Sequence, residues 1–244
     1  MNRAKWLPGS PLPRRVSAEA LDDLLVSDPR AVRSRHDLYR INRIMRTRSL
    51  VVRALSALPG RTPQRIVELG CGDGQVMLDI ARCLSRRWPA VHLTLVDRQP
   101  LVAPHTVQAF ADLGWNVHCV TEDVMDWVRL PDGPPFDLMV CNLFIHHFEG
   151  PHLSGLLSGL SLRTRVFFAC EPHRARLPLI CSHLVGLIGA NAVTRSDAVL
   201  SVHAGFRDHE LSAVWMQSSS FHWRLKEYSL GLFSHCFLAL QESQ

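Results

Sequence analysis

The chain has 244 residues, of which 47% are hydrophobic and 20% are charged, and its formal net charge is +5. This length and composition predict a soluble globular protein with a sizeable core, organised as one domain with an extension. No apolar run reaches the ~18 residues that a membrane helix needs, and the basic start lacks the apolar segment of a secretory signal. We therefore expect a cytoplasmic protein without a membrane span.

Basic residues are concentrated near the amino terminus. Residues 1–60 hold twelve Arg and Lys against five Asp and Glu, a surplus that could meet RNA, an acidic ligand or only water. The seven cysteines are scattered without a C-x-x-C pair, which indicates free thiols. The thirteen histidines lack the spacing of a zinc site, and we expect no metal.

Residues 1–60 are predicted to form a helical extension ahead of the main domain. Apolar stripes between residues 17 and 58 indicate two or three helices in this part of the chain. We expect the extension to act as a lid over the main domain, which spans residues 61–244.

Strands and helices alternate from residue 65 onwards, which predicts βαβ units and a parallel sheet. The expected strands are 65–69, 92–97, 116–121, 136–141 and 165–170, and the expected helices are 75–87, 101–113 and 153–162. Residues 221–228 and 232–240 are joined too closely for a crossover helix, so they predict an antiparallel hairpin at the sheet edge. The apolar segment 173–206 predicts a second helical cap over an acceptor pocket; the alternative is a helix that covers the sheet.

The stretch VELGCGDGQ at residues 67–75 follows the first strand and places three glycines before a helix. In an open α/β sheet, ligands bind at such a point, outside the carboxyl ends of the strands. A dinucleotide site needs G-x-G-x-x-G, but Gln75 stands in place of the third glycine. Glu68 and Asp73 would repel a pyrophosphate, whereas an acid suits the sulfonium and ammonium of S-adenosylmethionine (SAM). The stretch therefore favours SAM over NAD.

Acidic residues also end the next two strands. Asp97 can accept hydrogen bonds from both ribose hydroxyls. Asp123 can accept one from the adenine amine while the N–H of Val124 meets a ring nitrogen. Each acid alone could equally be a solvated loop residue or a helix cap, and Asp123 could cap a helix over 124–128. Three acids that end three successive strands indicate a SAM site more specifically than any one of them.

The segments E-L-G-C-G-D-G, L-V-D, E-D-V and F-D-L-M-V-C-N-L-F-I-H-H-F resemble, in this order, the motifs of class I SAM-dependent methyltransferases, over about residues 60–240. The resemblance implies a Rossmann-like α/β fold: a seven-stranded, mostly parallel sheet with an antiparallel last strand and helices on both faces. It also implies that Asn142 and Leu143 border the methyl group. The implied cofactor-binding residues are Glu68, Gly70, Cys71, Gly72, Gly74, Asp97, Arg98, Asp123, Val124, Asn142 and Leu143.

Two shorter segments, HDLYRINRIM at 36–45 and AGFRDHELSAVW at 204–215, are similar to methyltransferases found with type III polyketide synthases. Those enzymes O-methylate phenols or quinols, so the similarity implies a small aromatic acceptor in secondary or quinone metabolism. Tyr39 and Arg43 are candidates to reach the methionine carboxylate of SAM or the acceptor. The alternative for both is an exposed helix face.

Three histidines are candidate catalytic residues. His146 and His147 follow the fourth predicted strand, and His173 follows the fifth, at the expected ligand edge. A base that takes the hydroxyl proton assists methyl transfer to a phenol. The alternative for the pair is a cap on a helix or packing against the sheet.

The expected function is SAM-dependent O-methylation of a phenolic or quinol hydroxyl. Alternatives are C- or N-methylation of a small molecule, RNA methylation that uses the basic residues 1–60, and a binding protein without activity. The run N-L-F-I after the fourth strand, in place of N-P-P-[FY], counts against chemistry on base amino groups. We therefore expect a small-molecule partner and no nucleic acid, and either a monomer or a homodimer.

Overall fold

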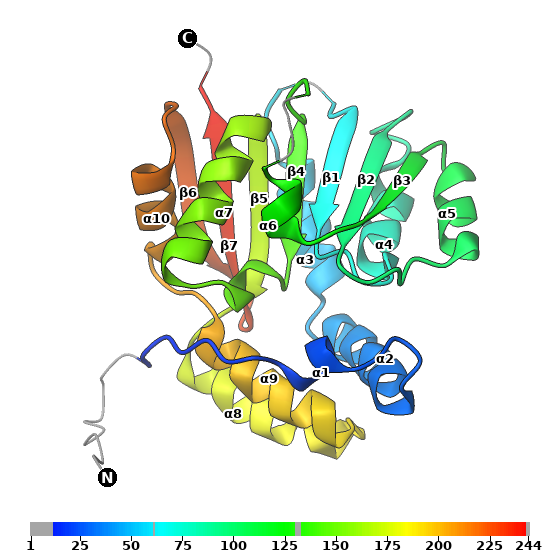
Figure 1. The fold of residues 1–244 in the computed structure, drawn as a ribbon, viewed down its shortest axis with the longest axis vertical. Coiled ribbons are helices and arrows are strands. Elements are labelled where there is room, and N and C mark those ends of the chain that lie inside the picture. Colours follow the sequence, from blue (N-terminus) through cyan, green and yellow to red (C-terminus); the bar gives the residue numbers. More distant parts are fainter. Residues whose placement is uncertain (1–11, 61, 130–132, 243–244) are drawn as a thin grey trace.

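A seven-stranded sheet forms the centre of the computed structural model, which describes residues 12–60, 62–129 and 133–242 (Figure 1). The strand order is β3-β2-β1-β4-β5-β7-β6. The strands are β1 (Arg65–Leu69), β2 (His92–Asp97), β3 (Asn116–Thr121), β4 (Leu138–Asn142), β5 (Val166–Pro172), β6 (Trp223–Leu230) and β7 (Ser234–Gln241).

One strand runs against the others. Neighbouring strands from β3 to β5 are parallel, whereas β7 is antiparallel to both β5 and β6. This confirms the predicted Rossmann-like sheet with an antiparallel last strand. Because β7 is inserted between β5 and β6, the outer edge of the hairpin is β6 and not the last strand of the chain.

The inner strands are buried on both faces, which explains their nearly continuous apolar sequences. Four of the five residues of β1 and of β4 are buried, whereas no residue of the edge strand β3 is. Strand order reverses between β1 and β4, because β2 and β3 lie on one side of β1 and β4 and β5 on the other. A parallel sheet offers its ligand site at this reversal, beyond the carboxyl ends of the strands.

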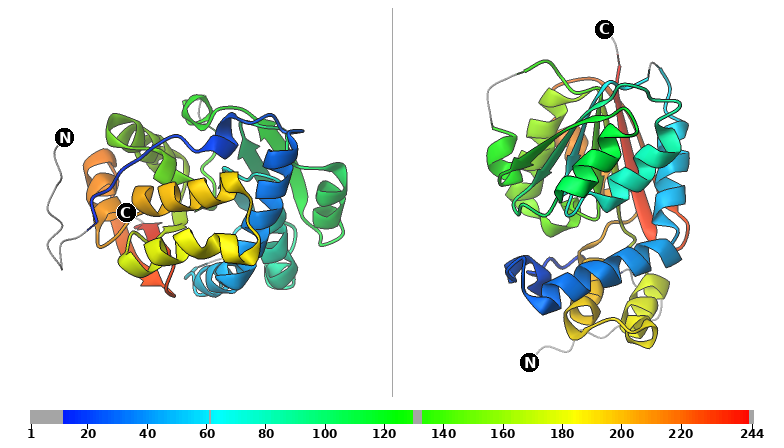
Figure 2. Two further views of the ribbon diagram at one scale, coloured as in Figure 1. Left: turned by 90° about the horizontal axis from the view of Figure 1, so that it is seen from below. Right: turned by 90° about the vertical axis from the view of Figure 1, so that its right-hand side faces the viewer.

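Helices cover both faces of the sheet (Figure 2). On one face lie α3 (Thr47–Ser56), α4 (Gln75–Leu84) and α5 (Pro104–Ala111); on the other lie α6 (Val124–Trp127), α7 (Gly150–Arg163) and α10 (Glu210–Ser218). Aromatic packing is dense under α10, where Trp215 stacks on Phe167 with ring centroids 5.1 Å apart. Each face thus has its own apolar core.

A helical cap stands beyond the carboxyl ends of the strands (Figures 1 and 2). It contains α1 (Ala20–Asp23), α2 (Pro29–Ile44), α8 (Arg176–Leu184), the 3₁₀ helix η2 (Val185–Ile188) and α9 (Ala192–Ala204). A segment near the amino terminus and the segment between β5 and α10 therefore meet here, and α9 contacts α1, α2 and α8.

Polar contacts hold the two halves of the cap together. The Asp37 carboxylate of α2 accepts a hydrogen bond from the Asn191 amide at 2.7 Å. The Asp197 carboxylate of α9 accepts hydrogen bonds from the amides of Ala20 and Leu21, both at 3.0 Å. The cap is thus built jointly by α1 and α2 and by the segment 173–206.

The helical extension divides differently from the expected boundary at residue 60. Only α1 and α2 belong to the cap, whereas α3 packs against α4 on the face of the sheet. Val51 and Leu55 of α3 are fully buried in that face, because they lie on one side of the helix at i, i+4 spacing. In the described part of the chain, helices are too short or too polar to span a membrane.

Candidate active site

A cavity of about 860 Å³ lies between the carboxyl ends of the strands and the cap, a size typical of small-molecule sites at ~300–1,000 Å³. The strand ends and the loops after them give it a polar wall, and the cap gives it a mostly apolar wall. The polar wall includes Glu68, Gly70, Gly72, Asp97, Asp123 and Asn142, and the cap wall includes Leu38, Ile41, Met45, Pro178, Leu184 and Val202.

The three glycines after β1 each adopt a left-handed backbone that favours glycine. Their φ angles are +67° at Gly70, +55° at Gly72 and +73° at Gly74. A Cβ at Gly70 would lie 2.1 Å from the ring of Phe144, whereas one at Gly72 would enter open space. Gly74 begins α4 and does not line the cavity. Gly70 therefore makes room for a side chain, and Gly72 leaves cavity space free.

Two buried oxygen atoms at the strand ends have no hydrogen-bond partner among the described residues. They are Oε2 of Glu68 and Oδ1 of Asn142, and both residues line the cavity. Burial, and then the charges of Asp73 and Asp97, raise the pKa of Glu68 well above its ordinary value. Because buried polar atoms are nearly always hydrogen-bonded, both oxygens are free to accept hydrogen bonds from a ligand in the cavity.

Asp97 is held in place at the end of β2. Its Oδ2 accepts a hydrogen bond from the Gly72 amide at 2.8 Å, and its Oδ1 accepts one from the Gln99 amide at 2.9 Å. The carboxylate thereby ties the glycine loop to the loop after β2. It is positioned by two backbone donors while still lining the cavity.

Asp123 is both a helix cap and a cavity residue. Its side chain accepts a hydrogen bond from the Met125 amide at 2.7 Å at the start of α6, which is the capping alternative considered for this residue. It also lines the cavity, together with Val124. The remaining predicted cofactor residues that line the cavity are Cys71, Arg98, Asn142 and Leu143.

Of the two residues predicted from α2, only Tyr39 lines the cavity, and its hydroxyl donates to Asp79 at 3.4 Å. Arg43 is exposed and lies outside the lining. The cavity face of α2 is set by Leu38 and Asn42, which are four residues and about one helical turn apart, and it continues to Met45 just after the helix. Arg43 falls off that stripe, so its predicted position at the site is wrong.

His173 is also placed away from the cavity. Pro172 lines the cavity, but His173 does not. Its Nε2 lies 3.4 Å from Ser229 Oγ, and its ring stacks on His235 in the hairpin at 6.0 Å. Successive side chains of an extended chain point to opposite sides, which is why the residue after Pro172 misses the cavity. Its prediction as a catalytic residue is corrected here.

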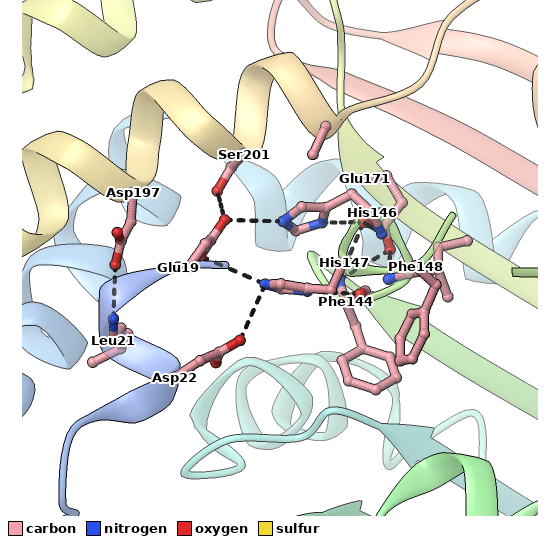
Figure 3. Close-up of polar contacts among 12 residues, drawn as sticks. Glu19, Leu21, Asp22, Phe144, His146, His147, Phe148, Glu171, Asp197 and Ser201 are labelled. Atoms are coloured by element: carbon pink, nitrogen blue, oxygen red, sulfur yellow. Dashed lines mark hydrogen bonds and ion pairs between the residues drawn. The ribbon is translucent and has the colours of Figure 1, made fainter. Parts of the chain in front are cut away.

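His146 and His147 do line the cavity, on the 3₁₀ helix η1 (Ile145–His147) (Figure 3). Glu171 at the end of β5 is fully buried and accepts hydrogen bonds from the amides of Phe144 and Ile145 at 3.1 Å. The same carboxylate contacts Nδ1 of His146 at 2.7 Å. A buried acid thus fixes the turn that carries the histidine pair.

Glu19 faces the same pair from the other side (Figure 3). Its two oxygens lie 3.5 Å from Nε2 of His146 and 3.5 Å from Nε2 of His147. Burial alone lowers the pKa of His146, but the hydrogen bond with Glu171 and the nearby carboxylate of Glu19 outweigh it and raise the pKa to about 9. Burial alone raises the pKa of Glu19, but the two nearby imidazoles outweigh it and lower the pKa.

The sequence analysis missed Glu19 as a site residue. It stands just before α1, in a segment that is held over η1 by contacts with α9. Arg14, in the same segment, donates to the carbonyls of His146 and Phe148 at 3.1 and 2.9 Å. No spacing in the sequence links residue 19 to residues 146–147, so only the packing of the cap brings them together.

Comparisons with known proteins agree with this geometry. Residues 66–163 match the family model described as a methyltransferase domain. Trans-aconitate 2-methyltransferase of Mycolicibacterium gilvum is 36% identical over 136 residues, which are 52% of this chain and 48% of that protein. The chain thus spans about half the length of this curated relative.

Solved structures show the same fold. An O-methyltransferase family protein from Burkholderia thailandensis aligns with a TM-score of 0.59 at 16% identity, over 89% of this chain and 61% of that one. Magnesium protoporphyrin IX methyltransferase from Synechocystis, solved with bound SAH, aligns with a TM-score of 0.50 at 16% identity, over 91% of each chain.

The sheet order, the glycine loop and these matches define the class of the protein: it has the fold of the class I SAM-dependent methyltransferases. Within it, residues 66–163 match the methyltransferase-domain model, in agreement with the resemblance in the sequence. Proteins of this class use SAM as the methyl donor.

Proposed function

We propose that the protein transfers a methyl group from SAM to a hydroxyl group of a small aromatic molecule, a phenol or a quinol. The observation that carries the proposal is one cavity with two chemically different walls. The strand ends offer acids and glycines to a cationic cofactor. The cap offers apolar side chains to a flat, apolar acceptor.

The polar wall suits SAM in particular. The buried Oε2 of Glu68 and Oδ1 of Asn142 lack donors, and the ammonium group of SAM carries N–H donors and a positive charge. Open space in front of Gly72 lets a ligand approach the backbone. We assign Glu68, Gly70, Cys71, Gly72, Asn142 and Leu143 to the methionine half of SAM.

The nucleoside half of SAM is assigned to the ends of β2 and β3. A carboxylate has about four acceptor positions, and Asp97 uses two of them on backbone amides. The others are available to the ribose hydroxyls. Asp123 and the amide of Val124 are assigned to adenine, with Arg98 beside them in the lining.

His147 is the best-placed proton acceptor. Its Nδ1 contacts the carbonyl oxygen of Phe144 at 2.8 Å, and a carbonyl only accepts, so Nδ1 carries the proton. In the neutral ring Nε2 is then an acceptor. SAM supplies a methyl group already activated by its sulfonium. Nε2 takes the hydroxyl proton of the acceptor, and Glu19 stabilises the imidazolium that forms.

The charge of the cavity favours a neutral acceptor. Its cationic lining, apart from histidine, consists of Arg35 and Arg98 among the described residues. The acidic lining residues are Glu19, Asp22, Glu68, Asp73, Asp97, Glu122 and Asp123. The curated relative is named for trans-aconitate, an anion that such a surface would repel. A phenol or quinol meets no such penalty.

Product analysis tests the proposal. The purified protein is incubated with SAM and, in parallel, a panel of phenols and quinols, trans-aconitate and a short RNA, and both SAH and methylated product are measured. We expect methyl ethers from the phenol panel alone. Methylation of trans-aconitate or RNA, or SAM binding without turnover of any phenol, would refute the assignment of the acceptor.

A further inference from the structure

We propose that Glu19, His146 and His147 form a binding site for a divalent transition-metal ion, with Zn²⁺ as the best match, on the wall of the cavity. The three ligand atoms lie within 4.8 Å of one another. They come from the segment before α1 and from η1 (Figure 3). The inference concerns metal binding by this chain and does not require the proposed acceptor. Nε2 of His147 can take a hydroxyl proton only in the metal-free protein, because a bound ion would use the same lone pair.

The Nδ1 atoms of both imidazoles already have the kind of partner that histidine ligands have in metal sites. Nδ1 of His146 bonds to the buried carboxylate of Glu171 at 2.7 Å, and Nδ1 of His147 bonds to the carbonyl of Phe144 at 2.8 Å. Histidine ligands typically give their second nitrogen to a carboxylate or a backbone carbonyl, which fixes the ring and its tautomer. Both Nε2 atoms are thereby left to bind one ion together with Glu19.

The distances between the Nε2 atoms and Glu19 are close to those between ligands of one metal ion. Each Nε2 lies 3.5 Å from an oxygen of Glu19, which is longer than the ~2.7–3.2 Å of an N–H···O hydrogen bond. Zn–N and Zn–O bonds of ~2.0–2.1 Å at tetrahedral angles place neighbouring ligand atoms ~3.3 Å apart. Nε2 of His146 is buried and has no hydrogen-bond partner among the described residues, so a ligand atom is left unused.

The surroundings orient the third ligand and balance the charge. The hydroxyl of Ser201 donates to the carboxylate of Glu19. Glu19 and the buried Glu171 together supply two negative charges beside the site. Asp22 has an oxygen 3.8 Å from Nε2 of His147. These charges offset those of a divalent ion.

The donor set selects the kind of ion. Two imidazoles and one carboxylate suit zinc and other first-row transition metals, whereas Mg²⁺ prefers oxygen ligands. Three protein ligands leave a fourth position open, which is typical of catalytic zinc sites. Because all three residues line the cavity, that position faces the space in which an acceptor would bind.

Metal titration of the full chain tests the site. Protein cleared of metal by a chelator is titrated with ZnCl₂ by calorimetry, and with CoCl₂ by visible absorption, where tetrahedral Co²⁺ gives intense bands. We expect the protein to bind one equivalent of Zn²⁺ or of Co²⁺, and to bind Mg²⁺ much more weakly. Glu19→Gln and His147→Gln should each weaken binding by at least ~10-fold.

The matched control is His173→Gln, which removes a histidine outside the cavity and should bind the ions like the unchanged protein. Circular dichroism of each variant shows whether the fold is kept. Absence of stoichiometric binding in the unchanged protein, or equal binding in folded Glu19→Gln and His147→Gln variants, would overturn the site. SAM binding, measured separately in the metal-free protein, reports on the proposed function and not on this inference.

Discussion

At the scale of single residues, the site depends on a few positions where the backbone or a buried charge leaves no alternative. Gly70 carries a left-handed backbone under the ring of Phe144. Glu68 keeps a buried carboxyl oxygen without a partner. Both carboxylate oxygens of Glu171 form hydrogen bonds at the start of η1 and with His146. The strained backbone at Gly70 and the unpaired oxygen of Glu68 both cost folding free energy, and such costs are typical of functional sites.

The two glycines that line the cavity should respond differently to alanine. Gly70→Ala adds a Cβ against Phe144 as well as strain at φ +67°, and we expect it to cost at least ~2 kcal/mol of unfolding free energy. Gly72→Ala meets only the backbone strain, about 1 kcal/mol. Urea unfolding measures both. Equal costs would show that Phe144 moves aside freely.

His147→Gln tests proton transfer. The substitution removes the base but keeps a polar side chain of similar reach, so kcat should fall by ~10²–10⁴-fold while the affinity for SAM stays unchanged. Asp97→Ala is the complementary variant, because it should weaken SAM binding. Steady-state kinetics and calorimetry, both on metal-free protein, separate the two effects. A normal kcat for His147→Gln would remove His147 from the proposed mechanism.

At the scale of elements, the structure relies on acids that satisfy the first amides of helices across long sequence separations. Asp197 of α9 accepts from the start of α1. Glu227 of β6 accepts from the amides of Leu211 and Ser212 in α10 at 3.1 and 2.8 Å. Carboxylates near helix amino termini also interact favourably with the helix dipole. These contacts lock the cap and the hairpin to their neighbours.

Asp197→Ala should release the segment that carries Glu19. The amides of Ala20 and Leu21 lose their acceptor, so their hydrogen exchange should accelerate by ~10-fold or more, equivalent to ~1.4 kcal/mol. Exchange in the sheet should stay the same. Asp126→Ala, which removes an exposed pair with Arg129, is the control. Unchanged exchange at Ala20 and Leu21 would contradict a role for Asp197 in holding this segment.

Glu227 should make stability depend on pH. Burial alone raises its pKa, but hydrogen bonds with His235 and Ser212 outweigh burial and lower the pKa below its ordinary value of 4.5. A carboxylate whose pKa is lower in the folded state stabilises the fold above the unfolded pKa. That stabilisation is lost as the pH falls through the folded pKa.

Urea unfolding at neutral and acidic pH measures this effect. We expect Glu227→Gln to reduce the unfolding free energy at neutral pH and to flatten its decline on acidification. An equally steep decline in the variant would assign the acid sensitivity to other carboxylates.

At the scale of the whole molecule, the cavity lies between the sheet and a cap assembled from two segments far apart in the sequence. A ligand bound there touches both parts and stabilises the folded state by mass action. SAM at 100 times its Kd should therefore raise the unfolding free energy by ~2.7 kcal/mol. It should also slow hydrogen exchange in α2 and α9 as well as in the strand ends. NAD at the same concentration is the control, and equal protection by NAD would refute the selectivity for SAM.

Much of the fold could be predicted from the sequence. The bounds of β1, β2 and β3 agree with the predicted strands, and the hairpin and the sheet-covering helices α4, α5 and α7 were expected. β4 begins two residues later than predicted, because Phe136 forms only an isolated bridge to Thr164. Short apolar runs and helical stripes report the local period of the chain, which is why such elements are readable before any tertiary contact is known.

By itself the sequence determined the Rossmann-like sheet, the glycine loop and the preference for SAM, because local periodicity places the strands and the glycine and acid motifs follow directly at the strand ends. Only the tertiary structure decided that Arg43 and His173 do not line the cavity, and that Glu19 meets His146 and His147. A small rotation of a helix changes which side chains face a site. In an extended segment, successive side chains point to opposite sides, so a shift of one residue has the same effect. Residues far apart in sequence meet only after the cap has packed on the sheet.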